Sequence, residues 1–375
     1  MKLALITSRY PKENQPYNHM FVHVRALYFQ SQGVDVTVFV PAKVSGTYTF
    51  QEIQVKEASA KEISQLLPAY DVLYLHLLNQ YPLADGGFAI YNAIRKRQQR
   101  TAIYLHGADV LLYPDGFFDF KWSLKSLAKV CYTNGWKKYA MSRFFNQMIQ
   151  NEKFAILTPS KWLASKVQAI YGVDQQAISV IPNGIDVDFF THSGGFALRY
   201  KMLCIRPLNS EYPVEDCVRL MQFLPEVFTL DIYGEGEDYP KINQLIQELK
   251  LNHRVRIVQQ FFVREELPQL FLQYGIFNAF SKSDTQGVTM CEALASELLV
   301  LSTNKTAIPE FVQDNVTGLL YDEREGMEHF AQRIVAICED QGIFERLITR
   351  GRASMQQINW KTQGEKEVTL LRKLM

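Results

Sequence analysis

The chain has 375 residues, of which 47% are hydrophobic and 21% are charged. At roughly 100–200 residues per domain, the length favours two domains with three as the alternative, and the composition excludes disordered and fibrous proteins. No stretch reaches the ~18 consecutive apolar residues of a membrane-spanning helix, and the apolar run before Arg9 is too short for a signal peptide. The five cysteines show no metal-type spacing, so we expect a cytoplasmic protein.

Charge is distributed unevenly along the chain. Residues 1–190 contain 20 Lys or Arg against 14 Asp or Glu, a balance of +6, whereas residues 191–375 contain 20 against 25, a balance of −5. The basic half suggests an acidic partner, such as a phosphate-bearing substrate or an anionic membrane surface. Chance scatter of surface charge explains the same counts equally well.

Short β-rich apolar runs alternate with helical segments in the first half, a pattern typical of a parallel sheet wound with helices. The segment FVHVRALYFQSQG predicts a helix with Gly33 as its C′ residue, and Ser160 is the expected N-cap of a later helix. The predicted strands cover residues 3–7, 34–40, 71–78, 101–106, 154–158 and 178–182.

The same pattern restarts after Gly194 and Gly195, which interrupt the periodicity. Strands are expected at 201–205, 229–233, 254–258, 275–280 and 298–302, and helices at 214–224, 239–249 and 289–297. We therefore predict an α/β fold class with two doubly wound, Rossmann-like domains in series. Ligands of such sheets bind outside the carboxyl ends of the strands, so two facing units would form a cleft.

Residues 280–321 carry the densest chemical signal. A predicted strand ends near Phe280, a polar loop follows, and Gly287 allows close backbone approach just before a helix that starts near Val288. The free amides at that helix start, from Gly287 to Thr289, predict an anion site suited to a diphosphate.

Two carboxylates accompany this helix start. Asp284 and Glu292 are eight residues apart, so one lies in the loop and the other in the helix. One carboxylate can accept both hydroxyls of a ribose, and the second can bind hydroxyls of a transferred sugar. The alternatives are a solvated helix carboxylate for Glu292 and a loop or N-cap role for Asp284.

This segment resembles the donor-site motif of the family 4 retaining glycosyltransferases (glycosyl transferases group 1), which have the GT-B fold. The shared order is an acid, a glycine-containing loop, Glu-Ala, Pro-Glu and Thr-Gly-Leu. In this chain the corresponding residues are Asp284, Gly287, Glu292-Ala293, Pro309-Glu310 and Thr317-Gly318-Leu319.

The resemblance extends over nearly the whole chain. It places His106, in YLHGADV, beside the donor sugar and Arg206, in CIRPL, at the donor diphosphate. The segment IPNGIDVDFF, which contains Asn183, resembles the end of the N-terminal domain, and INWKTQ near Trp360 resembles the start of a C-terminal helix that crosses back to it. Asn183 and Gly234 are expected to contribute to donor binding, together with Gly287, Val288 and Thr289.

These matches predict the domain boundaries. The N-terminal, acceptor-side domain should comprise residues 1–192 together with the C-terminal helix over 358–375. The nucleotide-sugar-binding domain should comprise residues 193–357.

Several positions depart from the family pattern. Glu211 stands where a Lys is expected after Arg206, so diphosphate neutralisation should fall more heavily on Arg206 and on the helix start. The other departures are Asp284 in place of Glu, His19 in place of Gly within the atypical loop 10–21, Glu297 in place of Gly, and Lys305-Thr306 in place of a Gly pair.

Three further features receive structural interpretations. His19, His23 and His76 are better explained as core histidines than as site residues. Asp186-Val187-Asp188 resembles a metal motif of another glycosyltransferase fold, but it follows Asn-Gly, so turn and capping chemistry explains it better. Gly234-Glu235-Gly236 lacks a third glycine, since Tyr239 stands there, and predicts a tight turn beside the nucleotide.

Residues 117–150 carry six Lys or Arg against Asp119 alone, with aromatic residues interleaved throughout. Basic stems with Trp and Phe suit the headgroup layer of an anionic bilayer, which would fit a lipid-linked acceptor. Surface helices whose aromatic side chains pack inward are the equal alternative. No motif supports nucleic-acid binding.

The sequence thus predicts a metal-independent and cofactor-free hexosyltransferase. It would move a sugar, with retention, from a nucleotide-diphosphate sugar to a hydroxyl of a glycan or lipid-linked glycan, in bacterial surface polysaccharide or lipopolysaccharide synthesis. The enzyme would be cytoplasmic, on or near the inner face of the membrane. The alternatives are a non-catalytic scaffold subunit of the same fold and a nucleotide-sugar epimerase or hydrolase.

Overall fold

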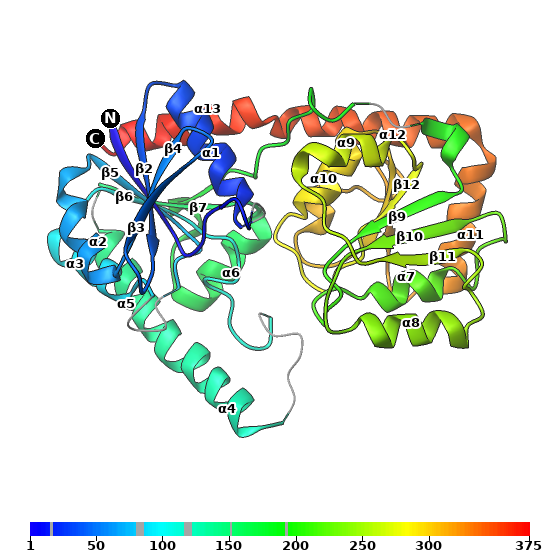
Figure 1. Ribbon diagram of the computed structural model, residues 1–375, viewed down its shortest axis with the longest axis horizontal. Helices are drawn as coiled ribbons and strands as arrows, with labels where there is room; N and C mark the ends of the chain where they lie inside the picture. The colour runs from blue at the N-terminus through cyan, green and yellow to red at the C-terminus, as the bar shows by residue number, and fades with distance from the viewer. Residues whose placement is uncertain (16–17, 80–85, 116–121, 151, 192–193) are drawn as a thin grey trace. The chain divides into compact units, whose positions relative to one another are not determined.

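The computed structural model describes residues 1–15, 18–79, 86–115, 122–150, 152–191 and 194–375. The chain divides into two compact α/β units (Figure 1). Unit 1 comprises Met1–Asn183 and Lys361–Met375, and unit 2 comprises Gly184–Trp360. The sequence placed the two boundaries after residues 192 and 357. The described residues 184–191 belong to unit 2 instead, where the backbone of Ile185 pairs with that of Asn359.

Unit 1 contains an eight-stranded sheet in the order β3-β4-β2-β1-β5-β6-β7-β8, in which only the β3–β4 pairing is antiparallel. Its strands are β1 (Lys2–Thr7), β2 (Asp35–Pro41), β3 (Gly46–Phe50), β4 (Ile53–Ala58), β5 (Val72–His76), β6 (Thr101–Tyr104), β7 (Phe154–Thr158) and β8 (Ile178–Val180). Its α-helices are α1 (Met20–Ser31), α2 (Ala60–Leu66), α3 (Phe88–Arg97), α4 (Leu124–Val130), α5 (Lys138–Met148) and α6 (Lys161–Tyr171). A π-helical stretch, Cys131–Lys137, joins α4 to α5, and the C-terminal helix α13 (Trp360–Lys373) belongs to this unit from Lys361 onward.

Unit 2 contains a six-stranded parallel sheet in the order β11-β10-β9-β12-β13-β14. Its strands are β9 (Lys201–Ile205), β10 (Thr229–Tyr233), β11 (Val255–Val258), β12 (Ile276–Asn278), β13 (Leu299–Thr303) and β14 (Leu319–Tyr321). Its α-helices are α7 (Val214–Leu220), α8 (Tyr239–Glu248), α9 (Leu267–Phe271), α10 (Val288–Ala295), α11 (Met327–Glu339) and α12 (Gln341–Met355). The predicted α/β class with two wound sheets is confirmed.

Local sequence signals explain how several of these helices begin and end. The Ser160 hydroxyl accepts a hydrogen bond from the amide of Leu163, so it caps α6 as predicted. Gly33, with φ of 73°, follows the last turn of α1 and is the predicted C′ residue. Among the described residues, none of the helices combines the length and the apolar character needed to cross a membrane.

Strand order reverses once in each sheet. In unit 1, β1 lies between β2 and β5, and in unit 2, β9 lies between β10 and β12. The helices that follow the two strands at the reversal, β1 and β5 in unit 1 and β9 and β12 in unit 2, run to opposite sides of the central position and cover opposite faces of the sheet, which leaves a crevice at the carboxyl ends of the strands. Ligand-binding residues are therefore expected after β1 and β5 in unit 1 and after β9 and β12 in unit 2.

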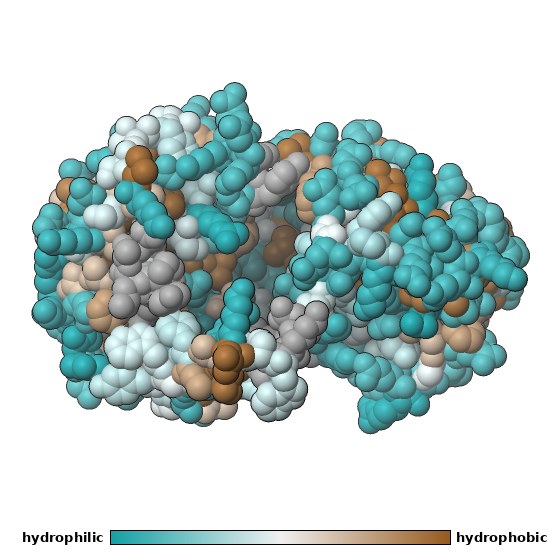
Figure 2. All heavy atoms as spheres, turned by 60° about the horizontal axis from the view of Figure 1, so that its bottom comes forward, coloured by the Kyte–Doolittle hydropathy of each residue, from teal (hydrophilic) through white to brown (hydrophobic). Residues whose placement is uncertain are grey.

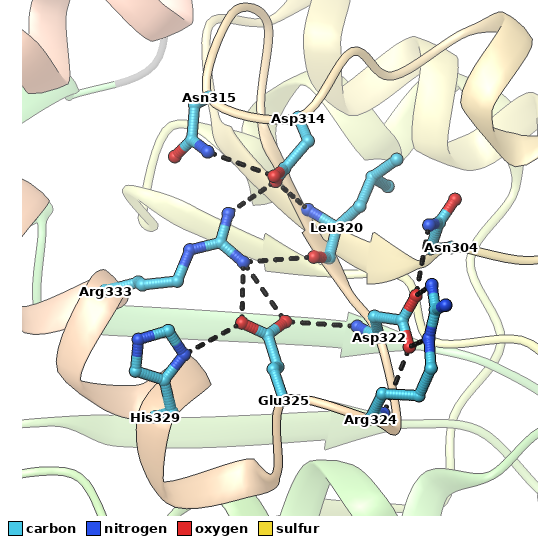
Figure 3. Close-up of polar contacts among 9 residues, drawn as sticks. All are labelled: Asn304, Asp314, Asn315, Leu320, Asp322, Arg324, Glu325, His329 and Arg333. Carbon is cyan, nitrogen blue, oxygen red and sulfur yellow. Dashed lines mark hydrogen bonds and ion pairs between the residues drawn. The ribbon is translucent and has the colours of Figure 1, made fainter.

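The outer edge of the unit 2 sheet is closed by a polar cluster (Figure 3). Arg333 of α11 donates to Asp314, to Glu325 and to the carbonyl oxygen of Leu320. His329 is paired with Glu325 at 3.1 Å. Each carboxylate shown in this cluster has a partner within the unit, so we interpret the cluster as a brace between β14 and α11.

A buried ion pair fixes α13 to unit 1. The Nε of Arg25, in α1, donates to both carboxylate oxygens of Glu367, in α13, at 3.0 and 3.1 Å. Tyr74 donates to the same carboxylate at 2.8 Å, and Arg25 also donates to Asn183 at 2.9 Å. Both charged side chains are less than a tenth exposed, so each depends on its partner.

Replacing Glu367 with Gln should destabilise unit 1 by about 3 kcal/mol, because it leaves the buried Arg25 guanidinium without a counter-charge. Urea denaturation, with hydrogen exchange of α1 and α13 to identify the unit that opens, measures the change. Glu365→Gln, at an exposed position of the same helix, is the matched control and should change stability by less than about 0.5 kcal/mol. Equal stability of the two variants would contradict the interpretation.

Candidate donor site

A buried arginine lies where the strand order of unit 2 reverses. Arg206 follows β9 directly and is 7% exposed. One Nη donates to the carbonyl oxygen of Ala279, after β12, at 3.1 Å, and the guanidinium lies over the ring of Tyr212 at 4.7 Å. Its Nε–H has no hydrogen-bond partner in the described part of the chain. An incompletely paired, buried guanidinium is a strong site for an anion such as a phosphate.

Asp284 lies beside this arginine but is engaged with the backbone. Its Oδ2 is 3.9 Å from an Nη of Arg206. Its Oδ1 accepts from the amides of Gln286, at 3.1 Å, and Gly287, at 2.6 Å. Asp284 therefore has the loop-capping role that the sequence analysis gave as an alternative. Its second oxygen, Oδ2, faces the guanidinium of Arg206.

The start of α10 provides further donors for an anion. Gly287 is the residue before the helix and has a left-handed backbone, with φ of 73°, which favours glycine. Its own amide is occupied by Asp284, so the anion site predicted at Gly287, Val288 and Thr289 is reduced to the last two. First-turn amides lack acceptors within their own helix, so Val288 and Thr289 can donate outward.

Thr306 holds the backbone of this loop in place. Its hydroxyl contacts both the amide of Asp284, at 3.0 Å, and its carbonyl oxygen, at 2.9 Å. Thr306 and Glu297 both have left-handed backbones, with φ of 52° and 58°. This conformation explains why glycine would be expected at both positions.

Glu292 is buried in α10 and has one cationic partner. Its Oε1 is 3.5 Å from the Nε of Arg264, which follows β11 and lies over the ring of Phe189 at 4.8 Å. Burial raises the pKa of Glu292 to about 7, although Arg264 opposes the rise. Burial together with the carboxylates of Asp284 and Glu292 also raises the pKa of the Cys291 thiol, which places both acids near this cysteine.

Lys282 lies near Glu211, the position at which the family pattern has a lysine and this chain does not. The ammonium group of Lys282 donates to the carbonyl oxygen of Ser210, next to Glu211, at 2.5 Å. Burial and the neighbouring carboxylate of Asp284 raise the pKa of Glu211. Lys282 thus brings to this loop a positive charge that residues 207–213 lack.

Gly234 and Gly236 allow two backbone segments to lie against each other. A Cβ atom on Gly234 would be 1.9 Å from the carbonyl oxygen of Arg206, and one on Gly236 would be 2.1 Å from that of Leu208. Both glycines are extended, and the amides of Arg206 and Leu208 donate to residues 233 and 235. Gly234 and Glu235 thus continue the β9–β10 pairing beyond the strands, and the predicted turn begins only at Gly236, whose carbonyl oxygen accepts from the amide of Tyr239 at 3.3 Å.

Unit 1 gathers histidines at the carboxyl ends of its own strands. His106, after β6, is half-buried, and its Nε2 shares a hydrogen bond with Nδ1 of the buried His76, the last residue of β5, at 3.0 Å. The carboxylate of Asp109 accepts from the amides of His106 and Gly107 and thereby fixes this loop. Burial and the charge of Arg25 hold the pKa of His106 well below its usual range, so this ring is neutral near pH 7.

His19 occupies the position before α1 with a left-handed backbone, φ of 49°, where the sequence comparison expected glycine. Its Nδ1 is 2.9 Å from the hydroxyl of Thr7, the last residue of β1. His23 is buried against Tyr10, at 2.7 Å, as the core interpretation predicted. His76 is likewise fully buried, as predicted, although it ends β5 at the carboxyl edge of the sheet. His19 differs from the prediction, because it is only partly buried and contacts the end of β1, at the edge where ligands of such sheets bind.

The predicted residues therefore fall into two groups. Unit 2 brings together Arg206, Gly234, Asp284, Gly287, Val288, Thr289 and Glu292. His106 and Asn183 lie in unit 1, where Asn183 is buried and accepts from Arg25. Sequence reasoning missed Arg264 and Lys282, because tertiary contacts with Glu292 and Ser210, and no local pattern, bring them to the site.

The remaining motif, Asp186-Val187-Asp188, has a structural role. The carboxylate of Asp186 accepts from the amide of Phe189 at 3.2 Å, which is turn chemistry, as predicted. Within the described ranges, no group of three or more His, Cys, Asp or Glu side chains is arranged to hold a metal ion.

Comparison with known proteins gives consistent matches over both units. The family described as "Glycosyl transferases group 1" matches residues 198–354, and "Glycosyltransferase Family 4" matches residues 20–189. The structure of Anabaena HepE in complex with UDP superposes with a TM-score of 0.78 at 17% identity, covering 99% of this chain and 100% of that one. This likeness supports the predicted GT-B architecture.

Two curated relatives match over shorter stretches. The GtfA subunit of a UDP-N-acetylglucosamine–peptide N-acetylglucosaminyltransferase from Streptococcus agalactiae is 27% identical over 36% of this chain and 27% of its own length. The alpha-monoglucosyldiacylglycerol synthase of Acholeplasma laidlawii is 30% identical over 25% of this chain and 23% of its own length. The matched part thus spans about a quarter of each relative.

Gly234→Ala should destabilise unit 2 by roughly 1–3 kcal/mol and weaken anion binding, because the new methyl group must displace the backbone at Arg206. Thermal unfolding with and without a bound nucleotide measures both effects. Gly342→Ala, in α12 with only an ordinary contact at 3.4 Å, is the control and should be neutral or slightly stabilising. Matching behaviour of the two variants would show that the close approach is unimportant.

Proposed function

Because the chain belongs to the glycosyltransferases of family 4, group 1, we propose that it transfers a sugar from a nucleotide-diphosphate sugar to a hydroxyl group of a glycan or a lipid-linked glycan. The proposal includes retention of the anomeric configuration, independence from metal ions and other cofactors, and a role in the synthesis of a bacterial surface polysaccharide or lipopolysaccharide.

The observation that carries the proposal is the environment of Arg206. A buried guanidinium with an unpaired Nε–H lies at the strand reversal, in the same loop region as the first-turn amides of Val288 and Thr289. This combination favours a diphosphate, because both guanidinium and helix-start amides bind phosphate oxygens. The similar protein HepE was crystallised with UDP, so a uridine-diphosphate sugar is the first donor to test.

These residues would also stabilise the leaving group. As the bond between sugar and diphosphate breaks, negative charge grows on the diphosphate oxygen, and Arg206 with the α10 amides would be aligned to receive it. Lys282 would add a further cation from the adjacent loop. Front-side attack, with the leaving phosphate taking the proton of the acceptor hydroxyl, is the retaining route that these groups suit.

Glu292 and Asp284 would orient the donor. The Glu292 carboxylate would accept the two ribose hydroxyls, with Arg264 balancing its charge. Asp284 has one oxygen committed to the loop, so Oδ2 alone would be available to the sugar. His106, with its neutral ring held by His76, would contact the sugar from unit 1.

On the acceptor side, we propose association with an anionic membrane surface. Residues 117–121 of the segment singled out in the sequence lie outside the described residues. In the remainder, Phe144 and Phe145 pack inward, whereas Trp122 and Leu124 are 89% and 87% exposed. The similarity to a glucosyldiacylglycerol synthase supports a lipid-linked acceptor.

Arg206→Gln should weaken binding of the preferred nucleotide-diphosphate sugar by at least about 30-fold, which corresponds to about 2 kcal/mol for a lost charge-assisted contact. A thermal-shift panel of such donors first identifies the preferred one, because a ligand at 100 times its Kd stabilises by about 2.7 kcal/mol. Arg219→Gln, at an exposed position of α7, is the control.

Turnover assays then separate the alternatives. Rapid consumption of donor without acceptor would favour an epimerase or hydrolase, and binding without any transfer would favour a scaffold subunit. If none of the donors raised the unfolding temperature, the proposal would be wrong.

Donor affinity should fall by about tenfold between pH 8 and pH 6. Below the pKa of about 7, Glu292 takes up a proton and its carboxylate is lost as an acceptor for the ribose. The phosphates of a nucleotide-diphosphate sugar stay ionised over this range, so their titration does not interfere. Isothermal titration at several pH values measures the effect, and Glu292→Gln should bind weakly and show a flat profile. A steep profile in that variant would assign the titration to another group.

A further inference from the structure

A pocket of about 320 Å³ lies on the surface of unit 1, away from the carboxyl-end residues described above. It is formed between α3 on one side and the π-helical stretch with α5 on the other. The lining residues are Phe88, Tyr91, Asn92, Arg95, Lys96, Trp136, Tyr139, Ala140, Arg143 and Phe144. None of them carries a negative charge, and none has a role in the proposed sugar transfer.

Three cations line this pocket, which has no acidic lining residue, although Arg95 also borders an adjacent pocket that contains Glu152. Arg95 is held in place by two neutral amide oxygens, of Gln147 at 2.8 Å and Asn92 at 3.1 Å. Neither Lys96 nor Arg143 forms an ion pair with any residue in the described ranges. Like charges that share a pocket repel one another, and an anion that binds all three relieves this repulsion.

The surrounding sequence is uniformly basic. Residues 86–100 and 122–150 together contain nine Lys or Arg and no Asp or Glu: Arg95, Lys96, Arg97, Arg100, Lys125, Lys129, Lys137, Lys138 and Arg143. Lys137 is buried and has Asp109 nearby, so the other eight residues concentrate the excess positive charge of the first half of the chain on the surface of these helices. Such a surface attracts polyanions and anionic membranes.

The walls of the pocket are aromatic. Trp136 and Tyr139 are both more than two-fifths exposed, and the Trp136 ring lies 6.0 Å from that of Phe88 and 6.4 Å from that of Tyr139. Tyr91 and Phe144 close the floor with an edge-to-face contact at 4.9 Å. Exposed Trp and Tyr rings beside Lys and Arg are the composition that proteins use at the level of lipid headgroups.

The neighbouring helix α4 supports the same conclusion. None of its seven residues is buried, and it extends away from the sheet of unit 1 (Figure 1). Leu127, like Leu124, is exposed on it, and Figure 2 shows apolar side chains at the lower front of unit 1, where α4 lies. A soluble phosphate compound would leave these apolar side chains in water, whereas a bilayer would cover them.

We propose that the pocket between α3 and α5 binds the phosphate group of an anionic membrane lipid, with Arg95, Lys96 and Arg143 on the phosphate and Trp136 and Tyr139 beside the glycerol and upper acyl chain. The occupied pocket and the apolar side of α4 then hold unit 1 on the bilayer. This inference deepens the acceptor side of the proposed function, since it brings the enzyme to a surface that carries lipid-linked acceptors.

Vesicle sedimentation tests the proposal on the full chain without any donor. Vesicles of phosphatidylcholine with 30% phosphatidylglycerol should bind the protein, and vesicles of phosphatidylcholine alone should bind it much more weakly. At about fivefold per basic residue, Arg95→Gln/Lys96→Gln/Arg143→Gln should lower the affinity about a hundredfold. Lys96→Gln/Arg143→Gln keeps the Arg95 contacts with Asn92 and Gln147, and should still lose about 25-fold if the triple variant misfolds.

A matched control removes three exposed cations from α13, at the opposite side of unit 1 from α4 (Figure 1). Lys361→Gln/Lys366→Gln/Lys373→Gln changes the net charge equally and should bind the anionic vesicles within about twofold of the unmodified chain. Equal losses in both triple variants would show that net charge alone acts, and would overturn the pocket.

Two soluble probes separate the lipid from a free phosphate. Monomeric dihexanoyl-phosphatidylglycerol should change the fluorescence of Trp136, as judged against Trp136→Phe, whereas inorganic phosphate at the same concentration should have little effect. An equal response to inorganic phosphate would overturn the lipid assignment. The pocket variants should bind donor normally, so a failure of donor binding in the unmodified chain would count against the proposed function and not against this site.

Discussion

The buried guanidinium of Arg206 is the feature on which the arrangement of unit 2 depends. A charge at 7% exposure is tolerated only if its surroundings supply acceptors, and here the carbonyl oxygen of Ala279, the ring of Tyr212 and a carboxylate at 3.9 Å do so only in part. The unpaired Nε–H leaves a requirement that an anion can satisfy. The loop after β12 and the start of α10 are shaped around this requirement, because Asp284 both faces the guanidinium and occupies the Gly287 amide.

Strand order explains why such groups meet. Because β9 lies between β10 and β12, residues that are distant in sequence follow adjacent strands and reach one edge of the sheet. Unit 1 repeats this geometry with different chemistry: Thr7 and His76 end its two central strands, and His19 contacts the former. Imidazoles lie at the reversal of unit 1 and the Arg206 guanidinium lies at that of unit 2, which is why the proposed diphosphate site is assigned to unit 2.

The sequence predicts those strands and site residues that a local pattern of residues marks. Buried strands read as continuous apolar runs, but β3 and β4 were missed because their side chains alternate between exposed and covered positions at the sheet edge. Asp284 and Glu292 could be identified from their spacing around Gly287. Arg264 and Lys282 could not, because their partners are Glu292 and the carbonyl oxygen of Ser210, and tertiary packing alone brings these together.

Net charge is a poor guide to the position of the proposed anion site. Residues 191–375 carry a balance of −5, yet they contain Arg206, Arg264 and the amides of α10, so the field at one point is set by a few oriented groups and not by the sum. The +6 of residues 1–190 is concentrated on α3 and on the α4–α5 segment, away from the histidines of unit 1. The two kinds of positive site therefore differ in physical character. The first is buried and would align the leaving group of the proposed transfer. The second is exposed and lined by aromatic side chains, as the proposed contact with a surface of many phosphates requires.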